Sequence, residues 1–295
     1  MDLSIFMQLL ILGLVRGSMY ALMGVGLSLI FGIMAIVNFA HGELFMLGCY
    51  IMYFFTIMMG LPFPVGIVAA GIGLLIVGVL LEKSLISTLR RKAGREWLMD
   101  SFVLTIGLMV IFQNLALIIF GAVQRGIPNL IAGQSDIGGV VFIYDHLVIL
   151  TLSLFTVGLL WYFVKNTHLG RAIRATSQHA EAAQTLGINV TRMYSVSFGI
   201  GAALAGIAGA LLITLYPANP NAGMGPVLKS FVVVILGGLG NIKGAVAAGI
   251  FVGILEAYTV FFISGGWQNV IVFSIVIAVL IFKPAGLFAA KGERA

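Results

Sequence analysis

The chain alternates long apolar runs with short polar connections along its whole length. An apolar run of about 20 residues is long enough to cross the hydrocarbon core of a membrane as a helix, so such runs predict transmembrane helices. We expect these helices at residues 17–37, 44–59, 63–81, 98–120, 146–164, 193–215, 228–240, 244–263 and 267–282. The pattern predicts an all-α integral membrane protein, a polytopic helical bundle with about 8–10 transmembrane helices, some of them broken or half-length.

Two apolar runs have lengths that do not fit one straight crossing. The run from residue 5 to residue 37 would be about 50 Å long as a helix, whereas the hydrocarbon core is about 30 Å thick. We therefore expect a break near Arg16 and Gly17, with a short interfacial or re-entrant piece before a full span. The run 227–240 is short and ends in Gly-Gly-Leu-Gly-Asn, which predicts a half-length or broken helix whose freed backbone groups face protein or a water-filled cavity.

The composition excludes a soluble globular protein. Hydrophobic residues make up 61% of the chain and charged residues 9%, whereas a soluble domain has about 25% charged residues. No segment is left for a separate soluble core, so we expect a single transmembrane domain over residues 1–295. The start of the chain lacks a basic region and a small-residue cleavage site, and we expect it to be uncleaved. The single cysteine, Cys49, can form no intrachain disulfide.

The basic residues define the orientation in the membrane. Three polar segments carry most of them, and we expect these segments to be cytoplasmic. Connections 60–64, 121–145 and 216–225 have few or no basic residues and are expected to be external. This distribution accounts for the net charge of +6 by topology, and we expect no nucleic-acid partner. The basic residues of the three cytoplasmic segments are Lys83, Arg90, Arg91, Lys92 and Arg95; Lys165, Arg171, Arg174 and Arg192; and Lys283, Lys291 and Arg294.

The longest cytoplasmic segment, residues 165–192, is polar and prone to form helix. Its apolar positions form a modest stripe between residues 170 and 186, and Gly187 marks the helix end, so we expect a short amphipathic helix or helix pair. One interpretation is a solvated connector that lies on the lipid surface. The other is a docking surface for a cytoplasmic partner, and the segment is longer than a simple connection needs.

Four blocks of sequence resemble the permease subunits of ABC importers for branched-chain amino acids. In chain order they are FGIMAIVNFAHGELFMLGCY, GRAIRATSQHAEAAQTLGINVTRMYSVSFGIGAALAGIAG, VVVILGGLGNIKGAVAAG and FKPAGLF. They extend over most of the chain in the order that the family has. The resemblance implies a multi-pass protein of the bacterial cytoplasmic (inner) membrane that translocates branched-chain or related hydrophobic amino acids and is not itself an enzyme.

The resemblance also assigns the segment 165–192 as the region that couples the permease to its ATPase. Glu181, Ala182, Ala183 and Gly187 match the E-A-A-x-x-x-G core of ABC importer permeases, whereas residues 197–200 read SFGI in place of I-x-L-P. Candidate coupling residues are therefore Arg171, Arg174, Glu181, Ala182, Ala183 and Gly187.

The energy source must lie on other chains, because this sequence has no G-x-x-x-x-G-K-[ST] phosphate loop. The resemblance implies two cytoplasmic ATPase subunits, a second related permease subunit in a heterodimer or a homodimer, and an extracytoplasmic solute-binding protein. Lipid surrounds the chain. We expect this chain to hold no cofactor and no metal, with ATP-Mg on the ATPase subunits.

Three other functions remain open from the sequence. A permease subunit for urea or short amides has a similar architecture. A stand-alone secondary transporter or channel, driven by an ion gradient, would transport solute without ATPase subunits. An enzyme of the membrane is disfavoured, because the ionisable residues are scattered and no nucleophile and base have a recognisable spacing.

The first candidates for the pathway or gate are Asn38, His41 and Glu43, expected at the cytoplasmic end of the 17–37 helix. A charge in the membrane centre costs about 3 kcal/mol or more, so these side chains should face protein, water or each other. They could cap the next helix or form an inner gate. A proton relay fits less well, because ATP would supply the work.

Further candidates lie in the second half of the chain. Glu256, in the middle of its span, lines the pathway, pairs with a basic residue or is protonated. Gln113 and Asn114 are expected to form interhelical hydrogen bonds, and Lys229 to extend to the outer boundary. The glycine-rich break offers backbone groups to a solute; its candidate residues are Gly237, Gly238, Gly240 and Asn241.

Overall fold

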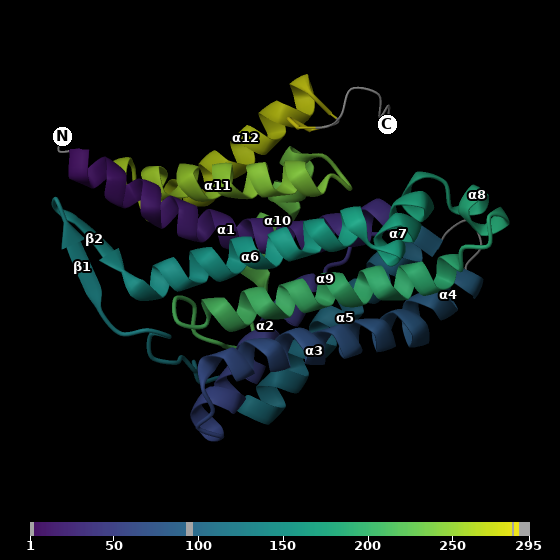
Figure 1. Ribbon diagram of the computed structural model, residues 1–295, viewed down its shortest axis with the longest axis horizontal. Coiled ribbons are helices and arrows are strands. Elements are labelled where there is room, and N and C mark those ends of the chain that lie inside the picture. The colour runs from purple at the N-terminus through teal and green to yellow at the C-terminus, as the bar shows by residue number, and fades with distance from the viewer. Residues whose placement is uncertain (1–2, 93–96, 285, 289–295) are drawn as a thin grey trace.

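The computed structural model describes residues 3–92, 97–284 and 286–288, and these residues form an α-helical bundle with one small hairpin (Figure 1). Strands β1 (Gln134–Ile137) and β2 (Val140–Ile143) pair antiparallel. The helices are α1 (Leu3–Met34), α2 (His41–Tyr53), α3 (Phe63–Leu81), α4 (Ser87–Lys92), α5 (Trp97–Phe120), α6 (Tyr144–Asn166), α7 (His168–Gln178), α8 (Ala180–Thr185), α9 (Val190–Leu212), α10 (Met224–Gly237), α11 (Ile242–Phe262) and α12 (Gln268–Phe282).

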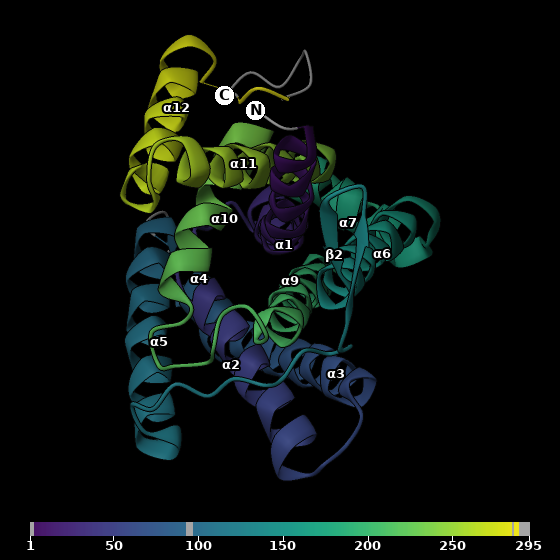
Figure 2. The same ribbon diagram turned by 90° about the vertical axis from the view of Figure 1, so that its left-hand side faces the viewer.

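The predicted membrane helices are present. Within the described residues, eight helical segments are long and apolar enough to cross a membrane, and α10 is a shorter apolar helix. Helices α1 and α9 are mostly buried, whereas α5 and α12 expose most of their apolar surface. Figure 2 shows α3, α5, α6 and α12 at the periphery, around α1 and α9. The exposed apolar surface of these outer helices is suited to contact with lipid.

The predicted break near Arg16 and Gly17 is wrong, because α1 is one continuous helix. Gly17 serves close packing: a Cβ atom there would lie 2.7 Å from Ile250 Cα of α11. The first turns of α1 reach the hairpin, where the Gln8 side chain exchanges two hydrogen bonds with the Val141 backbone of β2, at 3.1 and 2.9 Å. A long helix therefore fits because its first turns pack on an external hairpin.

The chain re-enters the protein directly after α1. Ala35, with φ 55°, turns the backbone, and residues 36–40 lead back into the interior. His41, the first residue of α2, is fully buried and its Nε2 lies 3.2 Å from the Met23 carbonyl oxygen of α1. The predicted position at the cytoplasmic end is therefore wrong, because α2 begins about three helical turns inside that end of α1.

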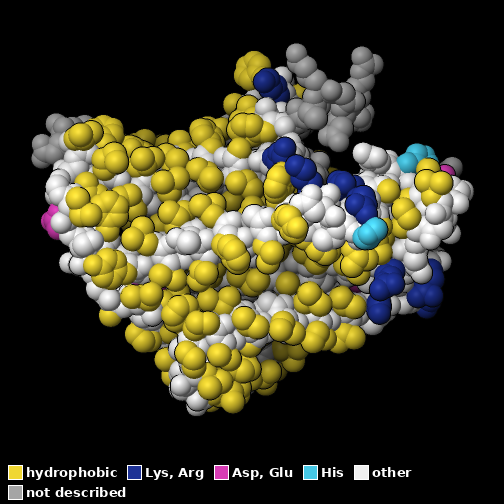
Figure 3. Space-filling model, in the orientation of Figure 1, with side chains coloured by type: hydrophobic (Ala, Val, Ile, Leu, Met, Phe, Trp, Pro, Cys, Tyr) yellow, Lys and Arg dark blue, Asp and Glu magenta, His cyan; other side chains and the backbone are white. Residues whose placement is uncertain are grey.

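The two ends of the bundle differ in charge. The hairpin lies at one end, and α4, α7 and α8 lie at the other (Figure 1). Lys and Arg side chains gather over this second end (Figure 3), which is therefore the cytoplasmic end by the positive-inside rule. Arg95, Lys291 and Arg294, which the sequence assigned to this side, lie outside the described residues.

Helix α3 does not end in a loop after Leu81 as predicted. A π-helical turn, Glu82–Ile86, continues it into α4. The Ser84 and Thr88 hydroxyls donate to backbone carbonyls four residues earlier, at 2.6 and 2.8 Å. Polar residues that the sequence placed in a connection thus form an extension of α3 on the cytoplasmic side.

Helix α10 is half-length, as predicted from its short apolar run. It ends at Gly237, and Gly238 and Gly240 have φ values of 88° and 82°. These left-handed conformations favour glycine and stop the helix. The Leu287 amide donates to the Leu236 carbonyl at 2.8 Å, so the segment after α12 satisfies part of the freed backbone.

Candidate functional site

The cytoplasmic segment forms the predicted helix pair, and each helix start has a side-chain cap. Thr167 Oγ1 accepts from the Gly170 amide at 3.0 Å before α7, and His179 Nδ1 accepts from the Ala182 amide at 3.2 Å before α8. Asn189 Oδ1 accepts from the Arg192 amide at 2.9 Å before α9. Such caps stabilise short helices by satisfying amides that have no intrahelical partner.

The residues of the E-A-A-x-x-x-G match lie at the tip of this segment. Glu181, Ala182 and Gly187 are exposed, whereas Ala183 is buried beneath α8. Gly187 has φ 84° and ends α8. Exposed Leu186 precedes it. The tip therefore presents a small, partly apolar face to the cytoplasm. The buried Ala183 side chain packs α8 against the rest of the protein.

The two arginines of α7 bond to different partners. Arg174 donates through Nη1 to the Val164 carbonyl oxygen and so ties α7 to the end of α6. Arg171 Nη2 lies 2.8 Å from His168 Nδ1 and remains exposed. Both arginines are exposed, and only Arg174 also anchors the segment to α6.

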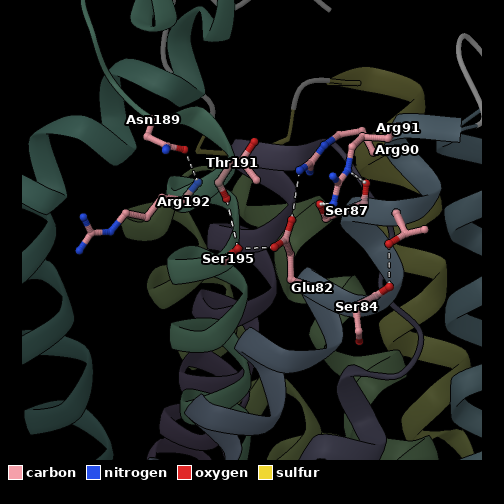
Figure 4. A network of polar contacts seen from close by, with 10 residues as sticks. Glu82, Ser84, Ser87, Arg90, Arg91, Asn189, Thr191, Arg192 and Ser195 are labelled. Atoms are coloured by element: carbon pink, nitrogen blue, oxygen red, sulfur yellow. Dashed lines mark hydrogen bonds and ion pairs between the residues drawn. The ribbon is translucent and has the colours of Figure 1, made fainter.

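A polar network connects this region to the extension of α3 (Figure 4). Glu82 is fully buried and accepts hydrogen bonds from Arg90 Nη2, at 3.2 Å, and from the Ser195 hydroxyl of α9. The Arg90 guanidinium lies 4.3 Å from the centre of the Tyr194 ring. Sequence reasoning missed Glu82, although an acidic residue in a strongly basic connection was a signal for an ion pair.

A groove of about 470 Å³ lies beside this network. Arg90 of α4 forms one wall. The other wall is formed by residues in and around the turn between α8 and α9, which are Gln184, Gly187, Asn189 and Tyr194. The candidate docking surface thus includes α4 as well as the helix pair.

Replacing Glu82 with glutamine is expected to lower the free energy of unfolding by about 1–3 kcal/mol, because a buried carboxylate with a charged partner is lost. The loss should appear as a lower thermal midpoint and as faster amide exchange in the first turns of α9. Ser84→Ala is the matched control: this exposed hydroxyl bonds only within its own helix, and its removal should change stability by less than about 0.5 kcal/mol. Equal effects of the two substitutions would contradict a connecting role for Glu82.

A second group of candidates lies in the interior around the start of α2. Asn38 and His41 are fully buried and Glu43 is 1% exposed. Glu43 Oε1 accepts a hydrogen bond from Gln113 Nε2 of α5 at 2.8 Å, so the expected interhelical bond of Gln113 is confirmed. The one expected for Asn114 is wrong, because its side chain donates to the Val110 carbonyl of its own helix at 2.8 Å.

A third group joins α1, α10 and α11. Lys229 Nζ pairs with Glu256 Oε1, and the Tyr20 hydroxyl donates to Glu256 Oε2 at 2.7 Å. All three residues are buried. The prediction that Lys229 extends to the outer boundary is wrong, because this pairing holds it inside. Among the interpretations of Glu256, pairing with a basic residue inside the protein is the one that the structure shows.

The glycine-rich break forms a separate group at the cytoplasmic end. Gly237 and Gly238 end α10, and Asn241 Oδ1 caps α11 by accepting from the Gly244 amide at 3.1 Å. Gly240 lies against Gly32 near the end of α1. In the described part of the chain no group of three His, Cys, Asp or Glu side chains is arranged to hold a metal ion. The candidates therefore divide into a cytoplasmic docking surface, two buried polar groups and the glycine-rich break at the cytoplasmic end.

Known proteins resemble this chain over nearly its whole length. The family model described as branched-chain amino acid transport system / permease component matches residues 9–281. The permease protein BraD of Pseudomonas aeruginosa is 33% identical over 96% of this chain and 95% of its own length. LivH of Escherichia coli is 31% identical over 96% and 95%, and a probable LivH of Methanocaldococcus jannaschii is 28% identical over 93% and 90%. The search of solved structures found no significant match.

The apolar helices and the similar proteins both indicate a membrane transport protein. The curated relatives are named as permease proteins of high-affinity branched-chain amino acid transport systems. With eight apolar segments long enough to cross a membrane among its described residues, the chain is a multi-pass inner-membrane protein, a transport subunit and not an enzyme. It belongs to the branched-chain amino acid transport system permease component family.

Proposed function

We propose that this chain translocates branched-chain or related hydrophobic amino acids as a permease subunit of an ABC importer. The observation that carries the proposal is the match of residues 9–281 to the family, together with a capped helix pair whose tip carries Glu181, Ala182 and Gly187. A segment of this kind at the basic end of the bundle is suited to receive force from a cytoplasmic motor.

The proposed assembly contains further chains. A permease component works with separate ATPase and solute-binding components. We propose two cytoplasmic ATPase subunits, a second related permease subunit that is a different chain or another copy, and an extracytoplasmic solute-binding protein. ATP-Mg binds the ATPase subunits, since this sequence lacks the phosphate loop, and this chain holds no cofactor.

Force on the tip of the helix pair would pass first to α9 and from there to the extension of α3. The Asn189 cap joins the tip to α9, and Glu82 joins α9 to the extension of α3 through Ser195. Closure of the ATPase pair then tilts these helices together and opens the pathway to each side in turn.

The two buried polar groups and the glycine-rich break hold the proposed pathway or gate residues. The backbone breaks before α2 and after α10 free polar groups that a solute can use. The proposed residues are Asn38, His41, Glu43, Gly237, Gly238, Gly240, Asn241 and Glu256.

Uptake by the reconstituted complex tests the proposal. The assembled complex, purified through this chain and supplied with its binding protein, should accumulate L-leucine only with ATP. A substitution of the phosphate-loop lysine in the ATPase should abolish uptake without loss of assembly. Leucine uptake by this chain alone, driven by an ion gradient, would overturn the proposal, and accumulation of urea in place of leucine would overturn the substrate class.

A further inference from the structure

A polar pocket of about 290 Å³ lies between the external end of α5 and the loop that precedes α10. Figure 2, which looks at the end that holds the hairpin, shows the segment between α9 and α10 beside α5. Carboxamides dominate the lining, with Leu117, Ala122 and Pro220 between them. Each carboxamide offers both hydrogen-bond donors and an acceptor. The carboxamide residues are Gln113, Asn114, Gln124, Asn219 and Asn221.

The wall of this pocket is connected to the buried group at the start of α2. Gln113 lines the pocket and donates to Glu43 Oε1 at 2.8 Å. Gly42 packs against Gly223, two residues after the pocket residue Asn221, and a Cβ at Gly42 would lie 2.4 Å from the Gly223 carbonyl oxygen. Glu43 thus lies directly behind the pocket, separated from it by one side chain.

The buried group has fewer hydrogen bonds than its polar atoms can form. Glu43 Oε2, His41 Nδ1 and both polar atoms of the Asn38 amide have no hydrogen-bond partner among the described residues. An unpaired buried polar atom is destabilising, and an unpaired charged group is more so. Of these atoms, Glu43 Oε2 belongs to the residue that Gln113 connects to the pocket, and an unpaired buried atom there indicates a place where another molecule supplies the partner.

Two of the buried carboxylates, Glu256 and Glu43, provide a comparison within one molecule. Glu256 has a resident cation, because Lys229 pairs with it. In the part of the chain that the structure describes, no basic side chain lies within 4.0 Å of Glu43. A carboxylate buried without a counter-charge is destabilising by several kcal/mol, so this position is suited to a cation that arrives from outside the chain.

We propose that the pocket and Glu43 form a transit subsite for a zwitterionic amino acid, an inference that rests on the proposed transport function. The ammonium group of the solute binds Glu43 after the Gln113 side chain moves aside. Carboxamide N–H groups of Asn219 and Asn221 donate to the carboxylate of the solute, and Leu117 contacts its aliphatic side chain. The subsite lies on the external half of the pathway, where solute enters from the binding protein.

A purely structural Glu43 predicts different behaviour. In that case replacement by glutamine removes an uncompensated buried charge, keeps the acceptor for Gln113 and leaves uptake intact. In the proposed subsite the same replacement leaves the complex equally stable or more stable, yet lowers the L-leucine uptake rate by about tenfold or more, because one partner of a charge pair in the transport intermediate is lost. Glu43→Asp, which keeps the charge, should retain part of the uptake.

The test uses the assembled complex in lipid nanodiscs without the binding protein, with L-leucine and 4-methylpentanoate as probes. L-Leucine at millimolar concentration should raise the thermal midpoint of the wild-type complex. 4-Methylpentanoate, which has the same carbon skeleton without the ammonium group, should not raise it, and neither probe should stabilise Glu43→Gln. Gln134→Leu, at an exposed carboxamide on β1 outside the pocket, is the matched control and should respond as wild type does.

Three outcomes would overturn the subsite. They are equal stabilisation by the two probes, stabilisation of Glu43→Gln by L-leucine, and wild-type uptake by Glu43→Gln. These results differ from failure of the proposed function, in which the wild-type complex itself takes up no amino acid with ATP. The subsite is therefore tested separately from the transport assignment.

Discussion

Replacing Lys229 with methionine, with Glu256 left in place, is expected to lower the free energy of unfolding by about 3–5 kcal/mol, because a buried carboxylate loses its counter-charge. Glu256 is fully buried and its other partner, Tyr20, is neutral and donates a single hydrogen bond. The half-length helix α10 should loosen first, since this pair attaches it to α11. The thermal midpoint of the purified protein, with amide exchange of residues 224–237, measures the effect.

The double substitution separates charge balance from packing. Lys229→Met with Glu256→Leu removes both charges and keeps similar volumes, so it should recover most of the lost stability. Lys243→Met is the matched control: Lys243 is exposed in the first turn of α11, and its loss should change stability by less than about 0.5 kcal/mol. A double variant as unstable as Lys229→Met alone would contradict the pairing as the source of the effect.

Apolar run length predicted most of the helices, because each span must cover the same hydrocarbon thickness. The prediction failed for α1, where the cause lies in a distant segment. Gly17 looked like a helix breaker, yet it is a packing site for α11, and the first turns are stabilised by contact with β2. A local pattern carries no information on which helix packs against a glycine more than 200 residues away.

The sequence pointed to several of the buried polar residues but not to the residues with which they pair. Glu256 was recognisable as a carboxylate within an apolar helix. Its partner Lys229 lies 27 positions earlier, and only the turn after α10 brings the two together. Glu82 was missed for the same reason, since its bond to Ser195 depends on how α3 packs beside α9. Side-chain chemistry is visible in a sequence, whereas pairing across helices depends on the fold.

Asp substitutions at two neighbouring alanines of α8 are expected to differ sharply. Ala183 is 2% exposed, so Ala183→Asp places a charge beneath α8 and should displace the tip, with uptake lowered by about tenfold or more while ATP hydrolysis continues. Ala182 is exposed, so Ala182→Asp should leave α8 folded and act only through contact with the ATPase. Uptake and ATP hydrolysis measured on the same reconstituted complex give the ratio of solute transported to ATP hydrolysed.

Two substitutions of Gly187, by asparagine and by valine, separate the effect of backbone geometry from that of surface contact. Its φ of 84° is unfavourable for a residue with a side chain, by about 1–2 kcal/mol for most residues and less for asparagine. A Cβ atom there meets no atom within 4 Å, so an effect of Gly187→Asn beyond its smaller backbone strain must come from the docked partner, whereas Gly187→Val strains the turn more. If the tip transmits force, Gly187→Val should lower the transport ratio more than Gly187→Asn. Unchanged ratios for Ala183→Asp and Gly187→Val together would contradict the coupling role, because the first displaces the helix and the second deforms its end.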